Sequence, residues 1–162
     1  MFELFIPFFL LFLFILFLAI IWRINARKYI TSGTVASAYD AWTQDKLLER
    51  LWGEHIHLGF YPSGNKNIDF REAKVQFVHE LVKWSNLDKL PKGSRVLDIG
   101  CGIGGSSRIL AKYYGFNVTG ITISPAQVKR ARELTPSGLN CNFQVMDALN
   151  LKFDDGAFDA VW

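Results

Sequence analysis

The stretch VLDIGCGIGGSSR, residues 96–108, joins a short apolar run to a cluster of glycines. Valine, leucine and isoleucine bounded by glycine are typical of a buried parallel strand, and Ser106 to Tyr114 is predicted to form the helix that follows. Because glycine has no Cβ, the backbone can turn sharply here and a ligand can approach the start of the helix. The unpaired N–H groups of a helix N-terminus favour a carboxylate or phosphate. The stretch therefore predicts a ligand site at the glycine loop, residues 100–105.

The spacing of Gly100, Gly102 and Gly105 also matches the G-x-G-x-x-G pattern of dinucleotide-binding proteins. Two features argue against a nicotinamide cofactor. Asp98 precedes the loop inside the strand, where a buried carboxylate needs a partner such as the α-amino group of a methionine-type ligand. The run from Gly120 to Ser124 has no Asp or Glu, although a nicotinamide site places one roughly 20 residues after its loop. A nicotinamide dehydrogenase is therefore the least favoured function.

Three segments carry a resemblance to one family. Residues 96–108 resemble the first motif of class I S-adenosyl-L-methionine (SAM) methyltransferases, and GFNVTGITISPAQVKRARELT, residues 115–135, resembles the next strand and helix of one branch. With AYDAWTQDKLLERLWGEHIHLGFY, residues 38–61, the chain is similar to the cyanobacterial 2-methyl-6-phytylbenzoquinol methyltransferases of tocopherol (vitamin E) biosynthesis. The γ-tocopherol methyltransferases share the GCGIGGSS motif and a WGEH-type segment. The resemblance implies an α/β, Rossmann-like fold, SAM as cofactor, and methylation of a ring carbon of a lipid-soluble, prenylated or phytylated quinol.

The resemblance also implies which residues bind the cofactor. Thr122, Ile123 and Gln127 match positions that border the adenosine, while Asp147 and Ala148 match the position that holds the adenine amino group. Other roles fit the same residues, because Ser124 with Gln127 forms a helix-capping pattern and an Asp after a strand favours a turn. The predicted cofactor residues are Asp98, Gly100, Cys101, Gly102, Gly104, Gly105, Thr122, Ile123, Gln127, Asp147 and Ala148. No catalytic residue is identified by the sequence.

Two histidines in the segment resembling the family, His55 and His57, suggest a metal site at first sight. Their i, i+2 spacing does not place them on one face of a helix, and no third ligand is near in sequence, so no metal is predicted. Packing in a loop is the favoured role. The resemblance implies that this region faces the methyl acceptor, so either histidine or Glu54 is a candidate for orienting a phenol or accepting its proton.

The N-terminal segment from Leu4 to Trp22 contains 19 residues without a charge. As a helix it would be roughly 28 Å long, which matches the hydrocarbon thickness of a membrane. Arg23, Arg27 and Lys28 follow it, so the positive-inside rule predicts a single-pass transmembrane helix with the remaining domain in the cytoplasm. A cleaved signal peptide and a buried core helix fit the segment less well. The resemblance implies a cyanobacterial plasma or thylakoid membrane.

Composition narrows the possible functions further. The 162 residues carry a net charge of only +3, without a basic stripe interleaved with aromatic residues, so nucleic acid is not expected as a partner. Cys101 and Cys141 have no metal-ligand spacing, and free thiols are favoured over a disulfide between them.

The remaining patterns predict the order of the elements. One or two helices are expected over residues 35–52, strands over 117–121 and 141–145, and the start of a fourth strand at 158–162. A helix over 69–84 is expected to bury the face of Phe70, Ala73, Phe77, Leu81 and Trp84.

Class I methyltransferases have a seven-stranded sheet, so the chain is interpreted as an amino-terminal fragment whose sheet stops after about strand 4. The predicted parts are a transmembrane helix (1–22), a basic flank and linker (23–33), a helical cap region (34–90) and the first half of the SAM-binding domain (91–162). Two alternatives stay open: a different acceptor, such as γ-tocopherol, a sterol or another lipid, and an inactive, membrane-anchored SAM-binding fragment.

Overall fold

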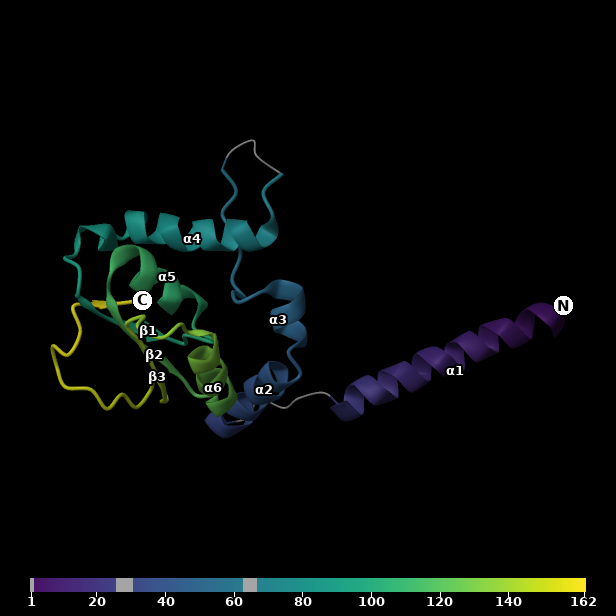
Figure 1. Ribbon diagram of the computed structural model, residues 1–162. Helices are drawn as coiled ribbons and strands as arrows, with labels where there is room; N and C mark the ends of the chain where they lie inside the picture. Colours follow the sequence, from purple (N-terminus) through teal and green to yellow (C-terminus); the bar gives the residue numbers. More distant parts are fainter. Residues whose placement is uncertain (1, 26–30, 63–66) are drawn as a thin grey trace. The chain divides into compact units, whose positions relative to one another are not determined.

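The computed structural model describes residues 2–25, 31–62 and 67–162, without the side-chain surroundings of residues 2–7, 23–25 and 32. The chain divides into two units, Met1–Ile30 and Thr31–Trp162 (Figure 1). The first unit contains α1 (Phe2–Asn25), whose described side chains from Phe8 to Trp22 are all exposed. Among the described residues, no helix has both the length and the apolar character needed to cross a membrane. The transmembrane helix thus stays a prediction, and its flanking charges Arg23, Arg27 and Lys28 lie outside the described side chains.

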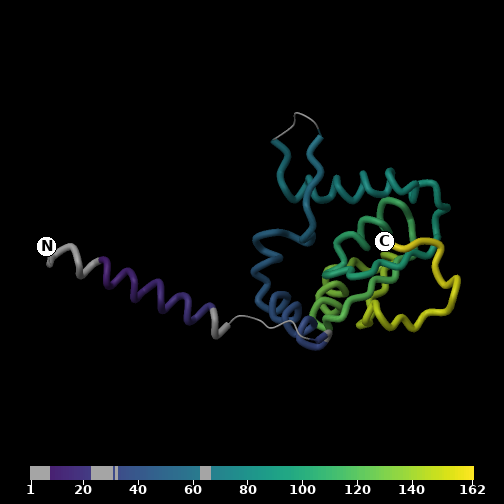
Figure 2. The backbone as a smooth tube through the Cα atoms, turned by 180° about the vertical axis from the view of Figure 1, so that it is seen from behind, coloured from purple at the N-terminus to yellow at the C-terminus, as the bar shows by residue number. Residues whose placement is uncertain are grey.

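The second unit is built on a parallel sheet with the strand order β3-β2-β1-β4. Its strands are β1 (Arg95–Ile99), β2 (Asn117–Thr122), β3 (Cys141–Val145) and β4 (Ala160–Val161), as the apolar runs predict. Figure 2 shows residues 146–159 looping away, in yellow, before the chain returns to the sheet beside β1. Because β2 and β4 lie on opposite sides of β1, the order reverses there, and open α/β sheets bind ligands at such a switch point.

Two crossover helices connect the first three strands. The helix α5 (Gly105–Tyr114) joins β1 to β2, and α6 (Pro125–Leu134) joins β2 to β3. Both crossovers step in the same direction across the sheet, so right-handed connections place both helices on one face. The main core joins β1 and β2 to α5 and to α4 (Phe70–Trp84), and its fully buried members are Val82, Val96, Leu110, Phe116 and Val118.

The helix α4 forms where the sequence predicts it, with Asp69 accepting hydrogen bonds from the N–H groups of Arg71 and Glu72. The predicted buried face is confirmed only in its middle, where Ala73 is buried and Phe77 and Leu81 are half-buried. Trp84 is 82% exposed and Phe70 is 37% exposed, whereas the buried positions are Ala73, Lys74, Val78 and Val82. Side chains four residues apart form two neighbouring rows along α4, at positions 73/77/81 and 74/78/82. Both rows are largely apolar, and the smaller valines of the second row occupy the contact with the core.

Before α4, the chain forms α2 (Ser32–Gln44) and α3 (Leu47–Trp52), the two helices expected over residues 35–52. Thr31, within the predicted linker (23–33), belongs to the second unit. Thr31 caps α2 by accepting a hydrogen bond from the N–H of Thr34, so α2 begins immediately after it. A 3₁₀ turn, η1 (Leu87–Lys89), leads from α4 into β1.

Candidate cofactor and active site

A cavity of about 360 Å³ lies at the carboxyl end of β1. One wall is the glycine loop, and the other is formed by residues from 39 to 57, called here the cover segment. Trp162, which follows β4, completes the lining. Of the predicted cofactor residues, six line the cavity: Asp98, Gly100, Cys101, Gly102, Gly105 and Gln127. The tertiary structure thus brings the three segments of the resemblance around one space.

The four glycines of the loop have different surroundings. Gly100 and Gly102 have φ angles of +75° and +56°, and a Cβ on either would meet no described atom within 4 Å. Gly104 (φ +80°) and Gly105 are instead surrounded by protein, because a Cβ would lie 2.6 Å from Phe143 and 2.8 Å from the Glu54 carbonyl oxygen, respectively. Gly104 does not line the cavity, so its role is packing. The first two glycines leave bare backbone beside the cavity, where a ligand can approach closely.

Asp98 lies on β1, two residues before Gly100, and is only 3% exposed. Its Oδ2 accepts a hydrogen bond of 2.5 Å from the Ser107 hydroxyl on α5. Burial raises the pKa of Asp98 to about 6, and the Ser107 hydrogen bond partly opposes that increase. A cationic group in the cavity would favour the ionised carboxylate.

Gln127 lies at the first turn of α6 and is held from two sides. Its N–H donates to Ser124 Oγ at 3.1 Å, as the predicted helix cap requires, and Pro125 occupies the first turn. Its side-chain Oε1 accepts a hydrogen bond of 2.7 Å from Thr122 Oγ1, leaving the Nε2 amide to donate. The reciprocal half of a capping box, from the Gln127 side chain to the Ser124 N–H, is replaced by this contact. Thr122 and Ile123 do not line the cavity, so Thr122 reaches it only through Gln127.

Asp147 and Ala148 follow β3 but do not line this cavity. The carboxylate of Asp147 accepts a hydrogen bond from the N–H of Leu149 at 2.9 Å, and the Asp147 carbonyl accepts one from the N–H of Asn150. This is the turn that an Asp after a strand favours. The adenine contact stays a prediction.

Two carboxylates from the helices before the sheet reach α6, although no acid occurs between Gly120 and Ser124. Asp40 Oδ1 accepts hydrogen bonds from Ser124 Oγ at 2.5 Å and from the N–H of Ala126 at 3.0 Å, which adds a second cap to α6. Glu49 lines the cavity and pairs with Arg130 through contacts of 2.5 and 2.9 Å. Sequence reasoning missed both acids because more than 80 residues separate the partners.

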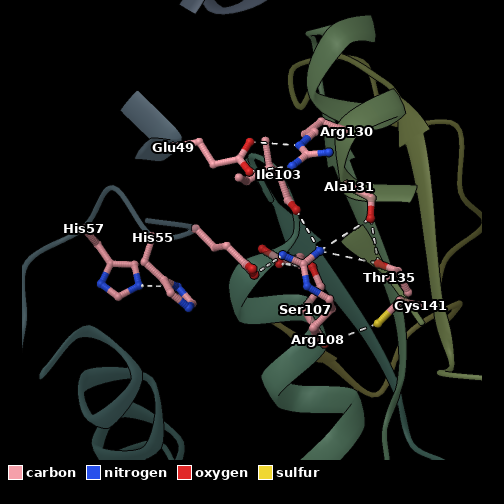
Figure 3. Close-up of polar contacts among 12 residues, drawn as sticks. Glu49, His55, His57, Ile103, Ser107, Arg108, Arg130, Ala131, Thr135 and Cys141 are labelled. Carbon is pink, nitrogen blue, oxygen red and sulfur yellow. Dashed lines mark hydrogen bonds and ion pairs between the residues drawn. The ribbon is translucent and has the colours of Figure 1, made fainter. Parts of the chain in front are cut away.

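A second group of contacts joins the cover segment to the glycine loop (Figure 3). Arg108 donates to the Ile103 carbonyl at 2.8 Å and to Glu54 Oε2 at 2.6 Å. Beside this pair, His57 Nε2 lies 3.1 Å from His55 Nδ1, and both rings line the cavity. Within the described part of the chain, no three His, Cys, Asp or Glu side chains gather as a metal site.

Both cysteines are free thiols, as the sequence predicts. Burial raises the pKa of Cys101 to about 12, so its thiol stays protonated although it lines the cavity. Nucleophilic chemistry at Cys101 is not favoured, since the thiolate is the reactive form.

Comparison with known proteins identifies the family. A family model described as a methyltransferase domain matches residues 96–162. The chain is 58% identical over 142 residues to the 2-methyl-6-phytyl-1,4-hydroquinone methyltransferase of Synechocystis, an alignment that covers 88% of the chain and 45% of that protein. The chain belongs to the class I, SAM-dependent methyltransferases.

Other similar proteins include two methyltransferases and a cyclase. The chloroplastic tocopherol O-methyltransferase of Arabidopsis thaliana is 40% identical over 126 residues, 72% of this chain and 36% of that one. Among solved structures, a putative sarcosine dimethylglycine methyltransferase from Galdieria sulphuraria superposes with a TM-score of 0.66 at 28% identity, covering 76% of this chain and 47% of that one. The [4+2]-cyclase SpnF superposes with a TM-score of 0.70 at 30% identity, covering 82% and 48%. The methyltransferase chain therefore spans less than half the length of these relatives.

The cavity of this methyltransferase fits SAM by the chemistry of its walls. The open space beside Gly100 and Gly102 accommodates a ligand against the backbone. The buried carboxylate of Asp98 suits the ammonium of the methionine moiety, and the N-terminus of α5 suits its carboxylate. These residues would hold the amino-acid end of the cofactor, while Gln127 supplies a hydrogen-bond donor nearby.

Proposed function

We propose that the enzyme containing this chain transfers a methyl group from SAM to a ring carbon of a prenylated or phytylated hydroquinone in tocopherol biosynthesis. The observation that carries the proposal is that the glycine loop and the cover segment together line one cavity. The substrate class is supported by the 58% identity to the Synechocystis enzyme, which extends through both walls of that cavity. Since the chain spans 45% of that relative, the activity is proposed for the whole protein.

When bound, SAM supplies a methyl group on a positively charged sulfur. The chain's own residues then act by binding and orientation. Asp98, Gly100 and Gly102 hold the amino-acid end, and Gln127, fixed by Thr122, borders the adenosine. The cover segment and Trp162 exclude water and place the acceptor ring, because a fixed approach of the two reactants lowers the barrier.

A second acceptor is γ-tocopherol or a related chromanol. The 40% identity to the tocopherol O-methyltransferase of Arabidopsis thaliana supports it, although over a smaller share of the chain. The two acceptors share an aromatic ring, a hydroxyl group and a lipid tail. Turnover assays with both, on the complete protein, separate them.

We also propose that residues 1–22 anchor the enzyme in a membrane, with the domain from residue 31 on the cytoplasmic side. The support is the absence of charged residues from Leu4 to Trp22 and the exposure of every described side chain from Phe8 to Trp22. An anchor suits a substrate whose lipid tail is confined to a bilayer. Flotation of the protein with vesicles tests this: Phe14→Lys combined with Leu18→Lys should reduce membrane recovery, and Trp84→Lys, at a more exposed site on α4, should not. Equal recovery of the wild type, the double variant and Trp84→Lys contradicts the anchor.

Calorimetric titration of the chain in detergent tests the cofactor. We expect S-adenosylhomocysteine to bind and NADH not to bind. Asp98→Asn, which keeps the shape of the side chain but removes its charge, should weaken S-adenosylhomocysteine binding by about tenfold. Binding of NADH, or binding of S-adenosylhomocysteine that Asp98→Asn leaves unchanged, would contradict the proposed site.

A further inference from the structure

The two histidines of the cover segment form a hydrogen-bonded chain that ends on the backbone. His57 Nδ1 lies 2.8 Å from the Leu58 carbonyl oxygen, which can only accept, so His57 Nδ1 carries a proton. In a neutral imidazole the other nitrogen is an acceptor. His57 Nε2 therefore accepts from His55 Nδ1 over 3.1 Å, and in the neutral pair the lone pair of His55 lies on Nε2 (Figure 3). The Leu58 carbonyl thus fixes the tautomer of both rings.

This pair is held rigidly from several sides. The His57 ring packs against Phe77 on α4 with 5.4 Å between centroids. The Lys74 ammonium donates to the carbonyls of Trp52 and His55 at 2.9 and 2.8 Å. The His55 ring lies so close to Gly105 that a Cβ there would be 2.8 Å away. The imidazole of His55 is therefore positioned against the glycine loop by packing and by hydrogen bonds.

Nε2 of His55 is available to a ligand. Within the described part of the chain, no protein group donates to it, and no buried side-chain nitrogen or oxygen is left without a partner. The atom is consequently open to solvent, and the ring that carries it lines the cavity. A lone pair at a cavity wall selects a hydrogen-bond donor and repels a carboxylate or phosphate.

The charge state of His55 supports its role as a neutral hydrogen-bond acceptor. Burial and the nearby His57, together with the cations Arg108 and Lys74, lower the pKa of His55 to about 4, and Glu54 only partly opposes this. The ring is therefore uncharged at neutral pH and too weak a base to hold the proton of a phenol, whose own pKa lies near 10 as in tyrosine. What it can do is accept a hydrogen bond and orient the hydroxyl.

We propose that His55 Nε2 is the binding site for a hydroxyl group of the aromatic methyl acceptor, and that His57 is the positioning residue that keeps this nitrogen unprotonated. The inference rests on the proposed function and deepens it, because it names the atom that recognises the acceptor class. An aromatic ring with a free hydroxyl binds, and the same ring with that hydroxyl blocked does not.

The test uses the chain in detergent, saturated with S-adenosylhomocysteine, with methylhydroquinone as the probe and its dimethyl ether as the matched compound without a donor. With ¹⁵N-labelled histidine, we expect the Nε2 signal of His55 in the acceptor range, and we expect methylhydroquinone but not the ether to shift it. His55→Leu should lower methylhydroquinone affinity by about tenfold, the usual effect of losing one hydrogen bond at a binding site. His57→Phe keeps an aromatic ring packed against Phe77 but removes the acceptor for His55 Nδ1. This variant should move the proton of His55 to Nε2 and lower the affinity for methylhydroquinone by a similar factor.

His79→Gln is the control, since this histidine binds the Tyr114 hydroxyl and does not line the cavity. Retained binding of S-adenosylhomocysteine shows that each variant is folded. A protonated Nε2 in the wild-type chain, or equal binding of methylhydroquinone and its ether, overturns the inference, and these readouts decide even where His55→Leu does not fold. Failure of S-adenosylhomocysteine to bind the wild-type chain would instead overturn the proposed function itself.

Discussion

Arg108 and Glu54 form an ion pair of 2.6 Å in which the two side chains have very different surroundings: the Arg108 side chain is 11% exposed and that of Glu54 is 46% exposed. The guanidinium also donates to the Ile103 carbonyl within the glycine loop. One buried cation therefore ties the loop that borders the cofactor cavity to the segment that covers it. The asymmetry in burial determines what each partner contributes.

Removing Arg108 should be more damaging than removing Glu54. Arg108→Leu leaves the Ile103 carbonyl of the loop without its donor, and we expect the free energy of unfolding to fall by about 3 kcal/mol. Glu54→Gln keeps a hydrogen-bond acceptor at an exposed position, and the expected loss is about 1 kcal/mol. Urea unfolding followed by tryptophan fluorescence measures both. Equal losses would show that the charge pair, rather than the loop contact, is the stabilising interaction.

Gly104 is predicted to tolerate no side chain. It has a positive φ of +80°, and a Cβ would lie 2.6 Å from Phe143 and 2.9 Å from Arg108. Gly138 is a matched control, with a φ of +85° and no described atom within 4 Å of the added Cβ. Gly138→Ala should reduce stability by about 1 kcal/mol through backbone strain alone, and Gly104→Ala by about 3 kcal/mol because overpacking is added. Similar losses in the two variants would exclude the packing role of Gly104.

Asp98 should make the fold less stable as the pH rises. Its folded-state pKa of about 6 lies above the ordinary value of 3.8, so the folded chain keeps a proton that the unfolded chain releases. This stabilisation is complete below about pH 4 and is lost as the pH rises through 6. Asp98→Asn removes that loss, and we expect it to raise the free energy of unfolding at pH 7 by about 2 kcal/mol. A destabilised Asp98→Asn at pH 7 would contradict the raised pKa.

Asp159 should have the opposite effect, making the fold less stable as the pH falls. Its hydrogen bonds with Arg95 lower its pKa to about 2, so its stabilising contribution is present above the ordinary pKa and is lost as the pH falls towards 2. Asp159→Asn should therefore lower stability at pH 7. The two Asp→Asn variants are expected to change unfolding in opposite directions under identical conditions.

His55 should make the fold more stable as the pH rises, the opposite of Asp98, over nearly the same pH range. Its pKa of about 4, below the ordinary 6.5, keeps it neutral in the fold while the unfolded chain takes up a proton. Its contribution is thus present above about pH 6.5 and is lost as the pH falls through 4. The wild-type stability should change little between pH 4 and 6, whereas His55→Gln should show a fall with rising pH and Asp98→Asn a rise. Parallel curves for the two variants would refute this account.

Local patterns predicted the elements because their causes lie within a few residues. The apolar run before Gly100 forms β1, the glycines set the turn into α5, and Ser124 with Pro125 starts α6. Each of these depends on backbone sterics or on hydrogen bonds to near neighbours. The pattern of α4 was less informative, because two adjacent apolar rows compete and only packing selects between them.

The lining of the candidate cofactor site was predicted in part. Asp98 and the glycines next to it are local features of one strand and loop, and they line the cavity as expected. The cap of Asp40 on Ser124, separated by 84 residues, and the tie between Arg108 and Glu54, separated by 54, have no local signal. Asp147 accepts a hydrogen bond from the N–H of Leu149 in a turn, and its contact with adenine stays a prediction.

The sequence by itself determined the strand, glycine loop and helix that create the site, the free thiols and the family. Only the tertiary structure decided what surrounds that site: which face of α4 is buried, which carboxylates reach α6, and which nitrogen of His55 keeps its lone pair. The physical reason is the range of the interactions. Turns, caps and strands depend on residues a few positions apart, whereas the walls of the cavity form only when the cover segment packs against the carboxyl end of the sheet.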